Sequence, residues 1–170
     1  LLIIELLFYP NDLVEIKIIF FLMVLLGLMS DKNILPNPLI RLIFQVTLIF
    51  CLIYFENLRI FDLRIVSLNY FLSNSIFNIL FTTFCLAILI NGSNFIDGLN
   101  GLLISSTIFI LLMLNKLNLI DNSIISNQSI NLIILTLLLL LLLNIFNILM
   151  LGDSGAYLLG FFIGLIIISS

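Results

Sequence analysis

Three aspartates of this chain have the residue type and setting to do chemistry. Asp97 and Asp153 are each next to a glycine, and Asp31 lies four positions after one. Glycine lets the backbone approach a ligand closely. Three carboxylates brought together repel one another, and a divalent cation removes that cost. The three acids together therefore indicate a cation site that handles a charged ligand.

The second of these acids lies in a regular pattern. Asn94, Asp97, Gly98 and Gly101 are spaced i, i+3, i+4 and i+7, which places them on one face if the segment is helical. Carboxylate and amide oxygens suit Mg2+, which usually coordinates phosphate as well. The chain has no His, so phosphate chemistry is favoured over zinc hydrolysis. On the residues alone, three solvated loop acids at a membrane surface remain an open alternative, because an acid costs far less at the interface than the roughly 2.5–3.5 kcal/mol at the bilayer centre.

The elements that must position these acids are membrane helices. Hydrophobic residues make up 63% of the 170 residues and charged residues 9%, against about 45–50% and about 25% in soluble domains. Continuous apolar runs such as 132–143 lack the alternation of a membrane barrel. The fold class predicted is all-α, a polytopic membrane helix bundle.

About six transmembrane helices are predicted in the chain, from uncharged runs and the length needed to span a bilayer. Their predicted bounds are 13–29, 38–55, 71–91, 99–118, 130–151 and from 156 onward. We interpret 1–170 as a single transmembrane domain, the central part of a longer membrane enzyme, because the sequence begins without Met and stops within an apolar run.

Alternating crossings put the three acidic segments on one side of the membrane. If each run crosses once, the turns 30–37, 91–98 and 152–155 share one face, and the turns 56–70 and 116–129 share the other. Lys and Arg are slightly more numerous near the second face, which by the positive-inside rule points to that face as cytoplasmic.

Composition also excludes several functions. A net charge of −3 without a basic run argues against nucleic acid as a partner. The lack of His removes imidazole metal sites and Ser-His triads. Cys51 and Cys85 lie far apart in apolar runs, so no disulfide framework is supported.

Three segments resemble one enzyme family. Residues 91–102, NGSNFIDGLNGL, resemble the N-x-x-N-x-x-D-G-x-[DN]-G-L signature of the polyprenyl-phosphate N-acetylhexosamine-1-phosphate transferases. Residues 151–160, LGDSGAYLLG, are similar to the family's G-D-x-G-x-x-x-x-G segment, and residues 27–31, GLMSD, to its G-x-x-D-D segment. The order and spacing of the three also fit.

The resemblance implies a reaction and its participants. Such enzymes transfer a sugar-1-phosphate from a UDP-sugar to polyprenyl phosphate, release UMP and use Mg2+, at the start of cell-wall or surface-polysaccharide synthesis. It implies a multi-pass protein of the bacterial cytoplasmic membrane with the motif loops facing the cytoplasm, which overrides the charge count. A homodimer is left open as a further partner.

The resemblance also implies roles for individual residues. Asp153 is the expected metal ligand with Asn94 as a second. Asp31 and Asp97 are the expected catalytic pair, which would orient or deprotonate the lipid phosphate or hold the metal through water. Expected substrate contacts are Asn91, in the same motif, and Asn100, at the uridine end.

The sequence departs from the family pattern at one position, and one rival function is compared with the transferase. Ser30 stands where the family has the first Asp of its pair, although a phosphate monoester is already largely dianionic near neutral pH and needs little help from a base. The rival function is a transporter or ion pathway, because intramembrane acids also mark ion routes. Such a protein would place its acids near the midplane, whereas these acids lie at predicted helix ends.

Overall fold

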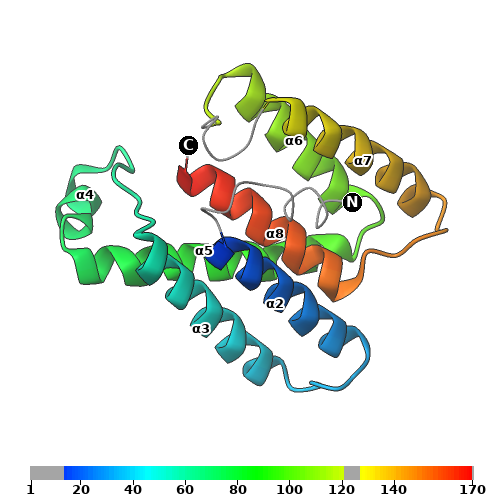
Figure 1. Ribbon diagram of the computed structural model, residues 1–170, viewed down its shortest axis with the longest axis horizontal. Coiled ribbons are helices and arrows are strands. Elements are labelled where there is room, and N and C mark those ends of the chain that lie inside the picture. The colour runs from blue at the N-terminus through cyan, green and yellow to red at the C-terminus, as the bar shows by residue number, and fades with distance from the viewer. Residues whose placement is uncertain (1–13, 121–126, 170) are drawn as a thin grey trace.

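The fold is entirely helical in the part of the chain that the structure describes. The computed structural model describes residues 14–120 and 127–169, and all regular secondary structure there is α-helix. The helices are α2 (Val14–Asp31), α3 (Pro38–Glu56), α4 (Val66–Leu72), α5 (Ser75–Asp97), α6 (Leu102–Lys116), α7 (Asn127–Ile145) and α8 (Gly152–Ser169) (Figure 1). The all-α prediction is confirmed.

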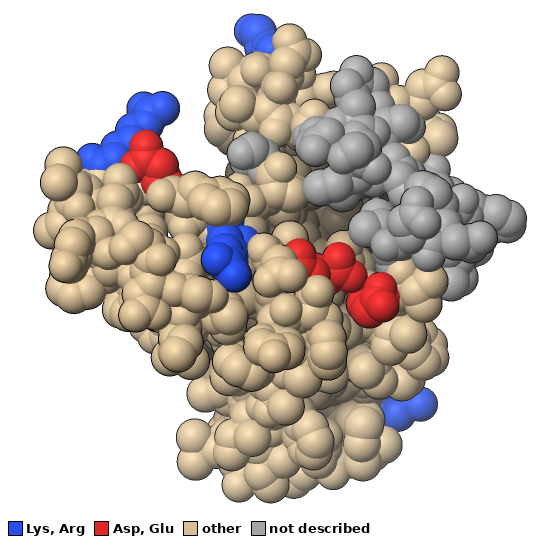
Figure 2. All heavy atoms as spheres, turned by 60° about the vertical axis from the view of Figure 1, so that its left-hand side comes forward, with Lys and Arg blue, Asp and Glu red and all other residues tan. Residues whose placement is uncertain are grey.

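Several helices are long and apolar enough to cross a bilayer. Four described segments meet both conditions: Pro38–Glu56, Ser75–Asp97, Gln128–Ile145 and Gly152–Ser169. The helix α6 is apolar but shorter, with 15 residues, and α2 carries Glu15, Lys17 and Asp31. Figure 2 shows few charged side chains, scattered over an otherwise uncharged surface. The chain is thus a multi-pass membrane protein.

The C-terminal helix α8 lies at the centre of the bundle. It contacts α5, α2 and α6, while α3 packs against α5 and α2, and α7 packs against α6 (Figure 1). Every residue of α8 from Ala156 to Ile166 is buried except Leu158, which is partly exposed. A helix that is apolar on every face suits this enclosed position, and it brings the first turn of α8 next to the ends of α2 and α5.

Asparagine side chains cap the starts of two helices, α3 and α5. Asn37 accepts a hydrogen bond from the Leu39 backbone N at 2.9 Å, and Pro38 follows at the first position of α3. Asn74 accepts in the same way from Ile76 at the start of α5. A polar residue at each start replaces the partners that first-turn N–H groups lack.

The loop between α3 and α4 is fastened by buried amides. Asn78 of α5 donates to the carbonyl oxygens of Ile60 and Leu72 at 2.8 and 3.0 Å. In the same loop, hydrogen bonds from the Arg64 backbone N–H and the Asn69 amide lower the pKa of Asp62. This polar loop follows the C-terminal end of α3, whereas Arg41 lies near the N-terminal end of that helix.

The predicted helix 71–91 differs from the observed elements at both ends. Ser73 and Asn74 separate the short helix α4 from α5, because the Asn74 side chain caps a new helix start. At the other end α5 continues through Gly92 to Asp97, so most of the predicted turn 91–98 is helix. In an apolar environment a backbone keeps its internal hydrogen bonds, and glycine does not end a helix there. The turn falls instead at Gly98–Gly101, where Gly101 has φ 79°.

The last two predicted helices were misplaced in a similar way. The helix α7 ends at Ile145 rather than at 151, and two residues after its end Asn147 takes a left-handed φ of 56°. The helix α8 begins at Gly152 rather than 156, which places Asp153 in its first turn. The first helix begins within the predicted range but runs two residues further, to Asp31. Residue 13 and residues 121–126, parts of the predicted first helix and of the turn 116–129, lie outside the described residues.

Candidate active site

The last residue of α2 contacts the first turn of α8. The backbone N–H groups of Asp153 and Ser154 donate to Oδ1 and Oδ2 of Asp31, at 2.8 and 3.2 Å. These N–H groups have no partner within their own helix, and the N-terminus of a helix attracts negative charge. Two acids separated by 122 positions are thereby placed side by side.

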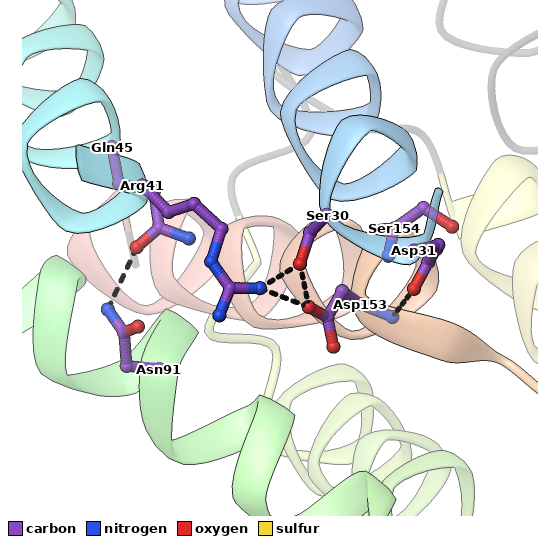
Figure 3. Close-up of polar contacts among 7 residues, drawn as sticks. All are labelled: Ser30, Asp31, Arg41, Gln45, Asn91, Asp153 and Ser154. Atoms are coloured by element: carbon purple, nitrogen blue, oxygen red, sulfur yellow. Dashed lines mark hydrogen bonds and ion pairs between the residues drawn. The ribbon is translucent and has the colours of Figure 1, made fainter. Parts of the chain in front are cut away.

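The side chain of Asp153 faces a cation from a third helix. Oδ2 of Asp153 forms an ion pair with Nη1 of Arg41 at 2.7 Å, and the Ser30 hydroxyl contacts the same two atoms (Figure 3). The two charged side chains are only 21% and 26% exposed, so the pair is partly shielded from solvent. Ser30 occupies the space between the two charges and bonds to both.

Asp97, the last residue of α5, faces the same point. Its half-buried carboxylate accepts a hydrogen bond from the Gly152 backbone, and the charges of Asp153 and Asp31 both act on it. The structure therefore brings together three acids, Asp31, Asp97 and Asp153, from the ends of three helices. This meeting agrees with the shared membrane face predicted for the three segments, which itself stays a prediction.

Asn91 lies one step away and is bound to α3. Its Nδ2 donates to Oε1 of Gln45 at 3.0 Å and to the Ala87 carbonyl at 2.8 Å (Figure 3). Gln45 is fully buried and its Nε2 has no hydrogen-bond partner in the structure, although the Tyr157 hydroxyl is a close neighbour. The contact between Asn91 and Gln45 lies about one helical turn along α3 from Arg41, which is four residues before Gln45.

The two other predicted site residues have different surroundings. Asn94 is half-buried, three residues before Asp97 on α5. Asn100 donates to the Asn147 side chain, and the neighbouring Gly101 N–H donates to Asn144, which joins the α5–α6 turn to the end of α7. Asn100 thus lies on an adjacent turn rather than among the three acids, and its expected contact with uridine stays a prediction.

An apolar groove runs along the outside of α3 and α5. It measures about 730 Å³ and is open on one side. Its lining comes from both helices: Pro38, Leu39, Leu42, Val46, Thr47, Phe50, Leu80, Thr83, Phe84, Ala87, Ile88 and Asn91. Along α3 it extends from Pro38 to Phe50, about 18 Å at the rise of an α-helix. Pro38, Leu39 and Leu42 flank Arg41 in sequence, so one end of the groove is formed by the same turn of α3 that carries Arg41.

Comparison with known protein families decides where the chain belongs. The sequence profile of Glycosyl transferase family 4 matches residues 13–170. The chain is a member of that family. The match covers all three acidic segments and the whole described bundle, and membership implies an enzyme that transfers a sugar-1-phosphate to polyprenyl phosphate. No curated protein and no solved structure matches the chain.

The donor groups at this family 4 site suit a Mg2+ ion that is held by substrate phosphates as well as by the protein. Among the described residues, no three acidic or cysteine side chains are arranged to hold a metal by themselves, and both oxygens of Asp31 already accept backbone hydrogen bonds. Mg2+ in phosphate-transfer sites is commonly held by one or two carboxylates together with substrate phosphates. A carboxylate from Asp153 and an amide oxygen from Asn94 are ligands of that type.

Arg41 is the site residue that was not predicted. A signal was present: Arg41 has apolar neighbours on both sides and lies in the first turn of its helix. Positive charge is unfavourable at a helix N-terminus, so an arginine there calls for an acidic partner from elsewhere. Only the tertiary structure shows that this partner is Asp153.

Proposed function

We propose that this family 4 enzyme transfers an N-acetylhexosamine-1-phosphate from a UDP-sugar to polyprenyl phosphate and releases UMP. Mg2+, held by Asp153 and Asn94, would neutralise charge on the diphosphate of the sugar donor. An oxygen of the lipid phosphate forms a bond to the sugar-linked phosphorus while the bond from that phosphorus to UMP breaks. Catalysis is then mainly positioning and charge neutralisation.

The observation that carries the proposal is the meeting of Asp31, Asp97 and Asp153 with Arg41 at one end of the bundle. Carboxylates for a metal and a guanidinium for phosphate oxygens are the two kinds of group that a phosphate-transfer site combines. Asp97 has the position to face the lipid phosphate, because it ends α5 and the groove lies along that helix.

The groove supports a long isoprenoid as acceptor. Its walls are apolar over most of their length, and exposed side chains such as Leu39 and Phe84 border it toward the bilayer. A chain lying there would place its phosphate beside Pro38 and Leu42, within reach of Arg41. The end with the acids would face the bacterial cytoplasm, where UDP-sugars are found.

The placement of the acids argues against an ion pathway. All three lie at helix ends, at the last residue of α2, the last residue of α5 and the second residue of α8. Ion and substrate routes of transporters place such groups near the bilayer midplane. Within the described spans the mid-helix polar groups, such as Gln45 and Thr82, carry no charge.

The test is an assay of the full-length protein in membranes. Labelled UDP-GlcNAc and related UDP-sugars are supplied with polyprenyl phosphate, and UMP and lipid-linked sugar are measured with Mg2+ or with EDTA. The expected result is equal formation of both products, dependent on the lipid acceptor and abolished by EDTA. UMP release that does not depend on polyprenyl phosphate, or turnover in the presence of EDTA, would contradict the proposal.

A further inference from the structure

One face of α2 is shaped to receive the first turn of α8. Gly27 and Asp31 are four residues apart on α2, and therefore lie one above the other on the same face. A Cβ on Gly27 would overlap the backbone of Ser154. The two helices thus touch backbone to backbone at Gly27, and this contact brings Asp31 against the end of α8.

Asp31 caps α8 from another helix. Its two oxygens accept from the N–H groups of Asp153 and Ser154, the bonds that a side chain at the N-cap position normally makes. The residue at the start of α8 is Gly152, which has no side chain for the task and a left-handed φ of 67°. The carboxylate oxygens of Asp31 lie 3.0 Å from where a Cβ of Gly152 would be. Among the described residues, the side-chain hydrogen bonds to these two N–H groups come from Asp31 of α2.

The cap acts on the residue that matters most for the metal. One of the two bonds is made to the backbone N–H of Asp153 itself, while the Asp153 side chain pairs with Arg41. Asp31 of α2 holds the backbone of Asp153, and Arg41 of α3 together with Ser30 of α2 holds its carboxylate. A displacement of the first turn of α8 would move the carboxylate away from Asp97 and Arg41.

We propose that Asp31 is a positioning residue, which orients Asp153 by capping α8 across the helix interface, and that its ability to take up a proton is not used. This inference rests on the proposed function only in making Asp153 the metal ligand. The cap requires hydrogen-bond acceptors rather than a base. An asparagine, also a good N-cap residue, retains one acceptor oxygen at the same distance from the backbone.

The inference also accounts for Ser30. With serine at position 30 and both oxygens of Asp31 bonded to the backbone, the segment 27–31 offers no unengaged carboxylate to the substrate. The nucleophile would be a lipid phosphate monoester, which is already largely dianionic near neutral pH. The segment contributes geometry, and the direct contacts with substrate fall to Asp97, Asp153 and Arg41.

The experiment compares Asp31→Asn with Asp31→Ala in the full-length protein. Asp31→Asn should keep kcat/KM within about 3-fold of wild type, and Asp31→Ala should lower it about 10-fold, because the first turn of α8 loses its cap and the Asp153 carboxylate can shift. Asp62→Ala is the matched control, because Asp62 also accepts a backbone hydrogen bond but lies in the loop between α3 and α4. That variant should leave kcat/KM unchanged.

A binding measurement separates positioning from stability. The affinity for Mn2+, used as a paramagnetic probe and measured by electron spin resonance, should fall in Asp31→Ala and stay near wild type in Asp31→Asn. If both variants lose activity equally, by about 100-fold or more as expected for loss of a base, or both lose Mn2+ affinity, the inference is overturned. Normal activity and Mn2+ affinity in a folded Asp31→Ala would overturn it as well.

The two proposals fail in different ways. Absence of acceptor-dependent UMP release in the wild-type protein would defeat the proposed transferase function. The Mn2+ affinities and thermal stabilities of the two Asp31 variants would still test the cap, since neither measurement requires turnover.

Discussion

At the residue scale, the ion pair between Arg41 and Asp153 is the feature with most consequence. The guanidinium offsets the charge of three acids that meet at one point. If Mg2+ binds at Asp153 as proposed, it would supply the positive charge there, and Arg41 would become available to phosphate oxygens. The pair therefore links the stability of the site to the presence of its ligands.

Replacing Arg41 tests this link. In Arg41→Gln the acids lose their counter-charge, and we expect unfolding to become easier by about 1 kcal/mol, a modest value because the pair is partly exposed. That corresponds to a Tm about 2–4 °C lower in EDTA. Mg2+ should stabilise the variant more than it stabilises wild type. Arg59→Gln, in the loop that follows α3, is the control and should show neither change.

Replacing Asp153 tests the metal ligand directly. Asp153→Asn keeps the shape of the side chain but removes its charge, and loss of one such electrostatic contact typically costs about 100-fold or more in rate. The measurement is kcat across a Mg2+ titration. Turnover near wild type at low Mg2+ would remove Asp153 from the role of ligand.

At the scale of elements, the packing of α2 against α8 depends on one missing side chain. Gly27→Ala places a Cβ against the backbone of Ser154, and overpacking of this kind costs about 1–3 kcal/mol. We expect a lower free energy of unfolding and a lower kcat, because the first turn of α8 must shift.

Gly92→Ala is the matched control for that change. A Cβ at Gly92 meets no atom within 4 Å, and alanine is better than glycine inside a helix by about 0.5–1 kcal/mol. Thermal denaturation in detergent should therefore move in opposite directions for the two variants. Equal effects would show that the contact between α2 and α8 is looser than the structure indicates.

The groove between α3 and α5 gives a prediction about the acceptor lipid. Val46→Trp introduces a large ring on its wall, which should raise KM for a long polyprenyl phosphate about 10-fold and affect a short-chain analogue less. Leu138→Trp, on the exposed face of α7, is the control with no expected change. A KM that rises equally for both lipids would argue that the isoprenoid lies elsewhere.

At the scale of the whole molecule, the bundle has two different ends. One holds the three acids at the ends of α2, α5 and α8, and the other holds the α3–α4 loop, where Asp62 contacts Asn69 of α4. Membership in family 4 implies a polyprenyl-linked product, and the proposed donor is a cytoplasmic nucleotide sugar. The end with the acids should therefore face the cytoplasm.

Labelling of single cysteines tests this orientation. In a Cys51→Ser, Cys85→Ser background, Lys32→Cys and Ser67→Cys place exposed thiols at the two ends. A membrane-impermeant maleimide added to intact cells should label position 67 and not position 32, and should label both after permeabilisation. The reverse pattern would place the acids outside and would contradict a cytoplasmic donor.

Much of this molecule was predictable because membrane chemistry is local. Apolar runs of about 20 residues have no stable alternative to helix in a bilayer, so the all-α fold and the approximate positions of the long helices follow from composition. The alternation of crossings also placed Asp31, Asp97 and Asp153 on one side. The exact helix ends did not follow, because the extension of α5 to Asp97 and the start of α8 at Gly152 depend on partners from other helices.

The sequence by itself predicted the helical membrane fold, the family and a set of candidate site residues, since these depend on residue type and on spacing along the chain. Only the tertiary structure shows which contacts those candidate residues make. It placed Arg41 against Asp153, turned Asn91 toward Gln45 and Asn100 toward Asn147, and bonded both oxygens of Asp31 to the backbone of α8. The physical reason is that a hydrogen bond or an ion pair is set by distances of a few ångströms between helices, and no pattern within a single helix specifies which partner helix will be there.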